Sequence, residues 1–211
     1  MKDFFMLIGF SEILLVIFMQ WEVYVTKIVK TFSVSSYLIA LFLFYLSFIQ
    51  HSYIVLVLAI LTAVIRGFFI PYFILKRLSR DPWRERESTP ITGTASSIII
   101  SLMIGIFTYV LYEATMSSFV TISLGALPIA LIFQGAFLVI SRRSAFIQLV
   151  GYMVMENAAF LFTGYLFPDL PFSVEAGTVL DLIGIVMISG VIMRMRENSA
   201  KKSDDFDELR G

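Results

Sequence analysis

The sequence predicts an all-α, polytopic integral membrane protein with seven transmembrane helices, an N-terminus outside the cell and a C-terminus in the cytoplasm. Three observations lead to this fold class. The composition is 58% hydrophobic with a mean hydropathy of +0.87, whereas soluble domains are roughly 45–50% apolar. The apolar residues gather in runs long enough to cross a bilayer. The Lys and Arg residues are distributed very unequally between the two ends of these runs, which sets the orientation.

Taken in chain order, the apolar runs predict seven spans. They lie at residues 4–23, 32–48, 53–75, 95–112, 119–140, 146–167 and 176–193. The third span contains Arg66 and Pro71, and Pro128 inside the fifth span predicts a kink. The chain thus divides into an N-terminal three-helix part (1–75), a cytoplasmic loop (76–94), a fourth helix with its outer turn (95–118), a second three-helix part (119–193) and a charged cytoplasmic tail (194–211).

The basic residues predict the orientation of these spans. All of the 16 Lys and Arg residues except Lys2 and Arg66 fall on one side of the membrane when seven spans are drawn. Because cytoplasmic segments are enriched in Lys and Arg, we expect this side to be cytoplasmic. The partition also supports the number of spans, since an error of one helix would scatter the basic residues over both sides.

The span at residues 146–167 contains one ionisable side chain, Glu156, at its middle. A helix of this length extends roughly 33 Å at about 1.5 Å per residue, so it covers the bilayer core. Placing a charged side chain at that depth costs about 2.5–3.5 kcal/mol. A chain that needed only an anchor would avoid this cost. Glu156 is therefore the first candidate for function, with Asn157 as a second polar group in the same turn.

Four further ionisable residues lie inside predicted spans, namely Glu12, Glu22, Arg66 and Asp181. Glu22 and Asp181 lie near span ends, within reach of water. Glu12 is deeper, and it is either a structural partner for a polar group on another helix or a functional carboxylate. Arg66 stays charged near the centre of its span and so needs a partner. It either forms a fixed ion pair with Glu12, Glu156 or Asp181, or tunes the proton affinity of a nearby carboxylate.

Buried carboxylates together with a buried cation are the minimum requirement for a proton relay, and the same set would serve a transporter site. Other classes of function are disfavoured. The 16 acidic residues balance the 16 basic ones, so net charge implies no nucleic-acid partner. The chain has no cysteine, so it lacks the thiolates that iron–sulfur clusters and nickel–iron centres require. With a single histidine, a typical zinc site is also disfavoured. No hydrolase motif is present.

The segment at residues 141–162, SRRSAFIQLVGYMVMENAAFLF, resembles the hydrogenase-4 component E family, in which a Ser-x-Arg turn leads into a helix with G-Y-x-x-M-E-N. The likeness extends over nearly the whole chain. It includes a basic residue five before a proline in the third span, Arg66 and Pro71, then the hydrophilic loop, Asp181 in the last helix and the short tail. Members are membrane subunits of energy-converting nickel–iron hydrogenases and formate hydrogenlyases, and they lie beside antiporter-like subunits. The resemblance implies a nickel–iron centre and iron–sulfur clusters in partner subunits and no cofactor in this chain.

The part from residue 119 onward also looks like the small K subunit of complex I, which has three helices, an outside N-terminus and a cytoplasmic C-terminus. The second helix of that subunit carries a glycine, a glutamate two residues later, and then Asn-Ala. Here Gly151 matches the glycine, Asn157 begins the Asn-Ala pair, and Met153 occupies the glutamate position. The carboxylate is three residues further on, at Glu156, on roughly the same face. Asp181 approximately matches the glutamate of the third helix.

We therefore expect a multi-pass subunit of the cell membrane that is not itself an enzyme. The resemblance implies that it connects the peripheral hydrogenase-type subunits to antiporter-like subunits and contributes to a proton or sodium path. The candidate path residues are Glu156, Asp181, Arg66, Glu12 and Asn157. One alternative is a structural scaffold whose buried charges only set helix packing. Another is a stand-alone secondary transporter, which is disfavoured because the chain shows no paired inverted repeat.

Overall fold

The structure is a computed structural model that describes residues 2–79, 91–116, 125–166 and 190. Within these residues the chain is almost entirely helical and forms no strand. The elements are α1 (Lys2–Trp21), α2 (Val25–Gln50), α3 (Tyr53–Leu61), the π-helical segment η1 (Thr62–Phe69), α4 (Ile70–Leu78), α5 (Thr94–Met116), α6 (Ala126–Ser141) and α7 (Ala145–Leu166).

Five helices of the described part are long and apolar enough to cross a membrane. They are α1, α2, the continuous helix Tyr53–Leu78 formed by α3, η1 and α4, then α5 and α7. α6 is apolar but shorter, with 16 residues. The described residues leave out 117–124, which belong to the outer turn after the expected fourth span and the start of the expected fifth. They also leave out nearly all of the expected seventh span at 176–193. The all-α membrane class is confirmed, whereas the number seven and the orientation stay predictions.

Helix α2 is longer than the span predicted for it. The span was expected at residues 32–48, and the helix runs from Val25 to Gln50. The prediction began too late because the first turns of the helix carry Lys27 and Lys30, which interrupt the apolar pattern. Lys27 is 57% exposed and pairs with Glu22 at 3.1 Å. Long basic side chains extend to the headgroup layer in this way while their helix continues into the bilayer. Glu22 therefore lies in an interfacial ion pair.

A kink at Pro128 was expected, but Pro128 lies at the start of a helix and not in its middle. α6 begins at Ala126, so Pro128 lies in its first turn. The backbone N–H groups of a first turn have no acceptor within the helix, and a proline there removes no hydrogen bond.

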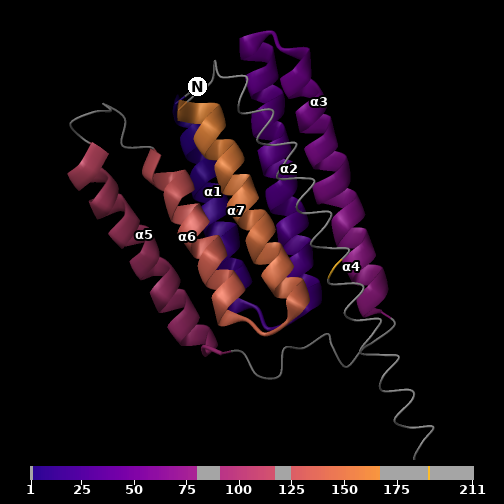
Figure 1. The fold of residues 1–211 in the computed structure, drawn as a ribbon, viewed down its shortest axis with the longest axis vertical. Coiled ribbons are helices and arrows are strands. Elements are labelled where there is room, and N and C mark those ends of the chain that lie inside the picture. The colour runs from indigo at the N-terminus through magenta and orange to yellow at the C-terminus, as the bar shows by residue number, and fades with distance from the viewer. Residues whose placement is uncertain (1, 80–90, 117–124, 167–189, 191–211) are drawn as a thin grey trace, which may run out of the picture.

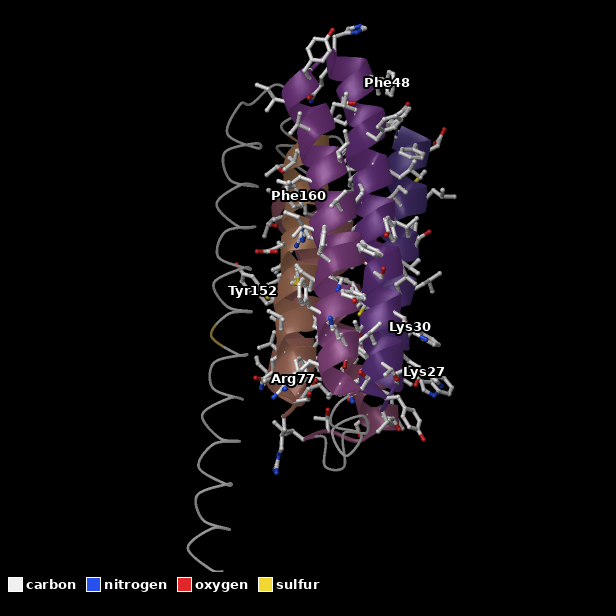
Figure 2. The ribbon with its side chains drawn as sticks, turned by 90° about the vertical axis from the view of Figure 1, so that its right-hand side faces the viewer. Lys27, Lys30, Phe48, Arg77, Tyr152 and Phe160 are labelled. Carbon is white, nitrogen blue, oxygen red and sulfur yellow. The ribbon has the colours of Figure 1, made fainter. Side chains whose placement is uncertain are left out.

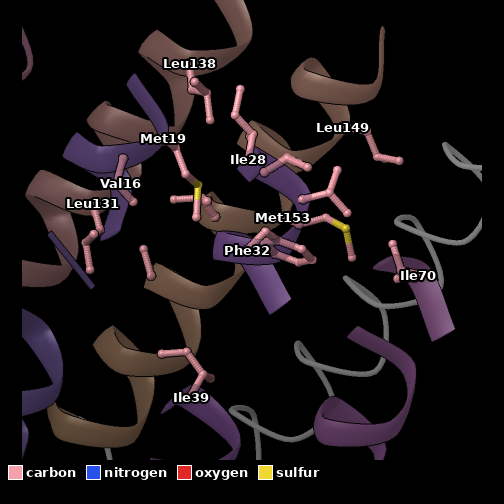
Figure 3. Close-up of a cluster of buried hydrophobic side chains, with 14 of the residues drawn as sticks. Val16, Met19, Ile28, Phe32, Ile39, Ile70, Leu131, Leu138, Leu149 and Met153 are labelled. Carbon is pink, nitrogen blue, oxygen red and sulfur yellow. The ribbon is translucent and has the colours of Figure 1, made fainter. Parts of the chain in front are cut away.

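The helices form an antiparallel bundle in which α7 lies among α1, α2 and α6 (Figure 1). α5 covers one outer side, next to α1 and α6, and the helix formed by α3, η1 and α4 covers the other, next to α2. Side chains from the inner helices meet in a common core (Figure 3). Val16 and Met19 of α1, Phe32 of α2, Leu138 of α6 and Met153 of α7 are all at most 1% exposed. Each inner helix is thus fixed by several others.

Apart from Lys2 and the buried Arg66, the basic residues of the described part collect at one end of the bundle. Figure 2 shows Lys27 and Lys30 of α2 and Arg77 of α4 near the same end. The turn between α6 and α7, which carries Arg143, lies at this end too, opposite the N-terminus (Figure 1). The helices are therefore ordered as the charge partition requires, and which side of the membrane this end faces stays a prediction.

Candidate functional site

An ion pair between Arg66 and Glu156 lies inside the bundle. Arg66 Nη2 donates to Glu156 Oε2 at 2.5 Å and to the carbonyl oxygen of Met153 at 3.0 Å. The two side chains are 0% and 2% exposed. The Arg66 guanidinium carbon also lies 5.3 Å from the centre of the Phe160 ring. Met153, Glu156 and Phe160 follow one another at helical spacing and so share one face of α7. This face contacts the guanidinium through the Met153 carbonyl, the Glu156 carboxylate and the Phe160 ring.

The backbone of η1 explains how a charged residue in a span comes to face inward. Pro71 has no N–H, so the carbonyl of Gly67 has no donor four residues later, and a regular turn would bring that carbonyl against the proline ring. The chain widens here to π-helical spacing, as the hydrogen bond from Ile70 N to Ile65 O shows. The hydroxyl of Ser33 on α2 donates to the Gly67 carbonyl in place of the missing N–H.

Gly67 is required at this point of the helix. A Cβ atom at Gly67 would lie 2.8 Å from the ring of Tyr37 on α2, closer than real Cβ contacts allow. The close approach brings η1 against α2 and buries Thr62, Arg66 and Gly67 together. Since π-helical segments are frequent at functional sites, the position of Arg66 within one fits a functional role.

A second carboxylate, Glu12 of α1, lies on the same polar layer. Its side chain is 0% exposed. Ser35 Oγ on α2 donates to Glu12 Oε2 at 2.5 Å, and Asn157 Nδ2 on α7 donates to Ser35 Oγ at 2.9 Å. Asn157 is the chain neighbour of Glu156. The polar layer, defined as Glu12, Ser35, Asn157, Glu156 and Arg66, therefore joins α1, α2, η1 and α7.

Some acceptor atoms of this layer have no hydrogen-bond partner among the described residues. Glu12 Oε1 and Asn157 Oδ1 are buried examples. Buried polar groups are nearly always paired, and exceptions mark a proton, a water or a bound ion that completes the site. At the Glu12 end of the layer, Oε1 is therefore the atom that a proton or a water would complete.

Four of the five residues predicted from the sequence come together in this layer, namely Glu156, Arg66, Glu12 and Asn157. The partner of Arg66 is Glu156, one of the three carboxylates considered. The fifth, Asp181, lies outside the described residues.

Sequence reasoning missed Ser35, which links the two carboxylates. Its signal was the cluster of Ser33, Ser35 and Ser36 within an apolar run, and all three are polar groups that a purely lipid-facing stretch would lack.

Arg142 is also placed differently from the expectation that it belongs to the aqueous basic residues. It is 0% exposed, and its Nη2 donates to the carbonyl oxygen of Gln20 at 2.6 Å. Gln20 lies in the last turn of α1, where carbonyls have no partner within the helix and carry partial negative charge. Gln148 Nε2 donates in turn to the Arg142 carbonyl at 2.8 Å. Arg142 therefore ties the turn before α7 to the end of α1, while its neighbour Arg143 is exposed.

No protein-family model matches the chain, and no solved structure matches it. One curated relative is the uncharacterized protein Rv0085 of Mycobacterium tuberculosis, which is 26% identical over 153 residues, covering 69% of this chain and 67% of that protein. Within the described residues, no group of three His, Cys, Asp or Glu side chains is placed to hold a metal ion.

Proposed function

We propose that the chain is a membrane subunit of an energy-converting hydrogenase-type complex, related to complex I. In this role its buried carboxylates form part of a proton or sodium path, and the subunit links the redox arm to antiporter-like subunits. The nickel–iron centre and iron–sulfur clusters belong to partner subunits, and the chain itself performs no redox step. The proposal rests on the polar layer and on the resemblance carried by the G-Y-x-x-M-E-N segment that contains Glu156.

The observation that carries the ion path is that two buried carboxylates and one buried cation share one polar layer deep inside an apolar bundle. Glu156 and Arg66 are 2.5 Å apart, and Glu12 is connected to Asn157, the neighbour of Glu156, through Ser35. Three charged residues in a membrane interior are costly, and buried ion pairs are often replaceable by apolar residues without loss of stability. Their presence supports a role that apolar side chains do not fill, namely taking up and releasing an ion.

Each residue has a distinct part in such a path. Glu156 binds and releases the proton. Arg66 stabilises the ionised form of Glu156 through a charge-assisted hydrogen bond, so protonation of Glu156 is coupled to the position of Arg66. Ser35 and Asn157 connect this pair to Glu12. Asp181 is the expected continuation on the following helix.

A scaffold role is the second candidate, and one observation favours it. The Arg66 guanidinium contacts three groups of α7, and this fixes η1 against α7. In a scaffold the same charges specify helix packing and never change protonation. A stand-alone transporter would work without other subunits.

The first experiment asks what accompanies the chain. Membranes are solubilised gently, and the complex that contains the chain is isolated on native gels. Migration with subunits that contain nickel and iron is expected. Migration of an active chain alone would contradict the proposal and favour the transporter.

The second experiment separates the path from the scaffold by replacing Glu156 with Gln. Gln keeps the size and hydrogen bonding of the side chain but does not carry a proton between sites. We expect an assembled complex in which ion uptake per electron pair, measured in vesicles, is reduced. Glu22→Gln is the matched control, since Glu22 is a carboxylate of α1's end that pairs with the exposed Lys27. Wild-type coupling in Glu156→Gln would exclude the path role of this residue.

A further inference from the structure

Among the described residues, the interior of the bundle holds one buried cation and two buried carboxylates. Arg66, Glu12 and Glu156 are each at most 2% exposed. The other buried charged side chains of the described part, Glu22 and Arg142, lie at the end of the bundle where α1 ends and α7 begins. α5 and α6 also pack against α1, and their described residues add no buried charge. One cation balances one carboxylate, so the second must be neutral or remain an uncompensated charge in a low dielectric.

The contacts identify which carboxylate holds the charge. Glu156 receives the guanidinium of Arg66 at 2.5 Å. Glu12 receives a neutral hydroxyl donor from Ser35 at one oxygen, and its other oxygen has no hydrogen-bond partner among the described residues. An ionised carboxylate in this position would lack both a counter-charge and half of its hydrogen bonds. Protonation of Glu12 removes the uncompensated charge, which is the larger part of that penalty.

The two carboxylates are nevertheless coupled. Two hydrogen bonds, of 2.5 and 2.9 Å, lead from Glu12 through Ser35 to Asn157, which adjoins Glu156. Arg66 has a long side chain and lies in the π-helical segment, next to Gly67, where the helix backbone departs from regular spacing. A displacement of the guanidinium along this layer, from Glu156 toward Ser35 and Glu12, would change its balance between the two carboxylates.

We propose that Glu12 carries a proton in this arrangement and that Arg66 exchanges between Glu156 and Glu12, so that the two carboxylates are protonated in alternation. The proposal rests on the proposed ion path and assigns its charge carrier. A proton that arrives on the Glu156 carboxylate converts it to an acid and cancels its attraction for Arg66. Arg66 then pairs with Glu12, whose O–H bond breaks and whose proton leaves to water. One proton enters and one leaves, and the layer holds one positive and one negative charge before and after.

Infrared spectroscopy of the full-length chain, purified with its accompanying subunits, tests the exchange directly. A protonated carboxylic acid has a carbonyl band that an ionised carboxylate lacks. At neutral pH the wild type should show a band that disappears in Glu12→Gln. In Glu156→Gln, Arg66 loses its partner and turns to Glu12, so the Glu12 band should lose most of its intensity. Glu22→Gln should leave the band unchanged. A Glu12 band of undiminished intensity in Glu156→Gln, or no such band in the wild type, would overturn the proposal.

A second variant applies if Glu156→Gln does not assemble. Ser35→Ala leaves the Arg66–Glu156 pair intact and removes the hydroxyl that donates to Glu12. If Glu12 is a neutral acid, its carbonyl band should move to higher frequency on losing this hydrogen bond; a band that does not move rejects the neutral acid. These readouts do not depend on transport. Loss of coupling in Glu156→Gln vesicles with an unchanged Glu12 band would retain the ion path and reject the exchange. Normal coupling with a weakened Glu12 band would retain the exchange of Arg66 and reject the ion path.

Discussion

Gly135 of α6 and Gly151 of α7 face each other so closely that a Cβ atom added to either would lie 2.9 Å from the carbonyl oxygen of the other. This reciprocal contact brings the two backbones together, as small residues do between membrane helices. It lies on the helix that carries Glu156, about one and a half turns before it. The register of α7 against α6, and with it the height of Glu156 in the bundle, therefore depends on both glycines.

Gly151→Val should destabilise the protein, because the added atoms meet backbone that does not yield. Overpacking of this kind costs about 1–3 kcal/mol. The free energy of unfolding in detergent or lipid, followed by helical content, measures the change. Gly105→Val is the matched control in α5, since the nearest atom to its Cβ is 4.0 Å away. Equal stability of the two variants would show that the glycine contact does not limit packing.

Arg66→Met should cost about 3–5 kcal/mol, because it leaves Glu156 buried without its counter-charge. The double variant Arg66→Met, Glu156→Met should recover most of this loss, since replacing a whole buried pair by apolar residues is close to neutral. Unfolding free energies of the two single variants and the double variant give the coupling of the pair. Full stability of Arg66→Met alone would contradict the pairing. A stable double variant without ion coupling would separate packing from transport.

Ser33→Ala should destabilise the junction of α2 and η1 by about 1–2 kcal/mol, because the Gly67 carbonyl loses its donor. The effect should shrink in a Pro71→Ala background, where residue 71 supplies a backbone N–H of its own. Ser11→Ala is the control, as the Ser11 hydroxyl donates to the Leu7 carbonyl of its own helix in an exposed hydrogen bond. Identical losses in the two backgrounds would mean that Pro71 is not the reason for the missing donor.

The predicted orientation is tested with reporter fusions. A reporter fused after Gly211 should be cytoplasmic, and one inserted at residues 113–117 should be external, because the basic end of the bundle is expected to face the cytoplasm. Activity of an enzyme that works on one side only, such as a periplasmic phosphatase, locates each fusion. Both reporters on the same side would remove the seven-span arrangement.

The sequence predicts the main outline of the described part because hydropathy alone determines which segments enter a bilayer. The spans at 53–75, 95–112 and 146–167 agree with their helices to within a few residues. The start of α2 was missed by seven residues because Lys27 and Lys30 are polar at their tips and apolar along their stems. Hydropathy counts the whole residue and does not separate these parts.

The site was predictable where a charge interrupts an apolar run, or where a polar residue adjoins such a charge, as Asn157 does. Glu12, Arg66 and Glu156 are found in this way, whereas Ser35 carries no charge, and serine is common in membrane helices. The choice of Glu156 as partner of Arg66 was beyond sequence reasoning. It depends on how far the π-helical turn rotates the helix before Pro71, which is a property of the backbone and of the Ser33 contact. Of two adjacent arginines, likewise, only the geometry of the turn decides that Arg142 points inward.

The attachment of Arg142 to the end of α1 has a mechanical consequence. Together with Gln148 and the Gly135–Gly151 contact, it anchors the first part of α7 to its neighbours. If α7 tilts, it pivots near this anchored end, and the displacement of its residues increases with their distance from that end. Glu156 lies roughly 16 Å along α7 from Ala145 at about 1.5 Å per residue. The carboxylate therefore lies on the part of the helix that a pull from a neighbouring subunit would move, while the basic end of the same helix stays in place.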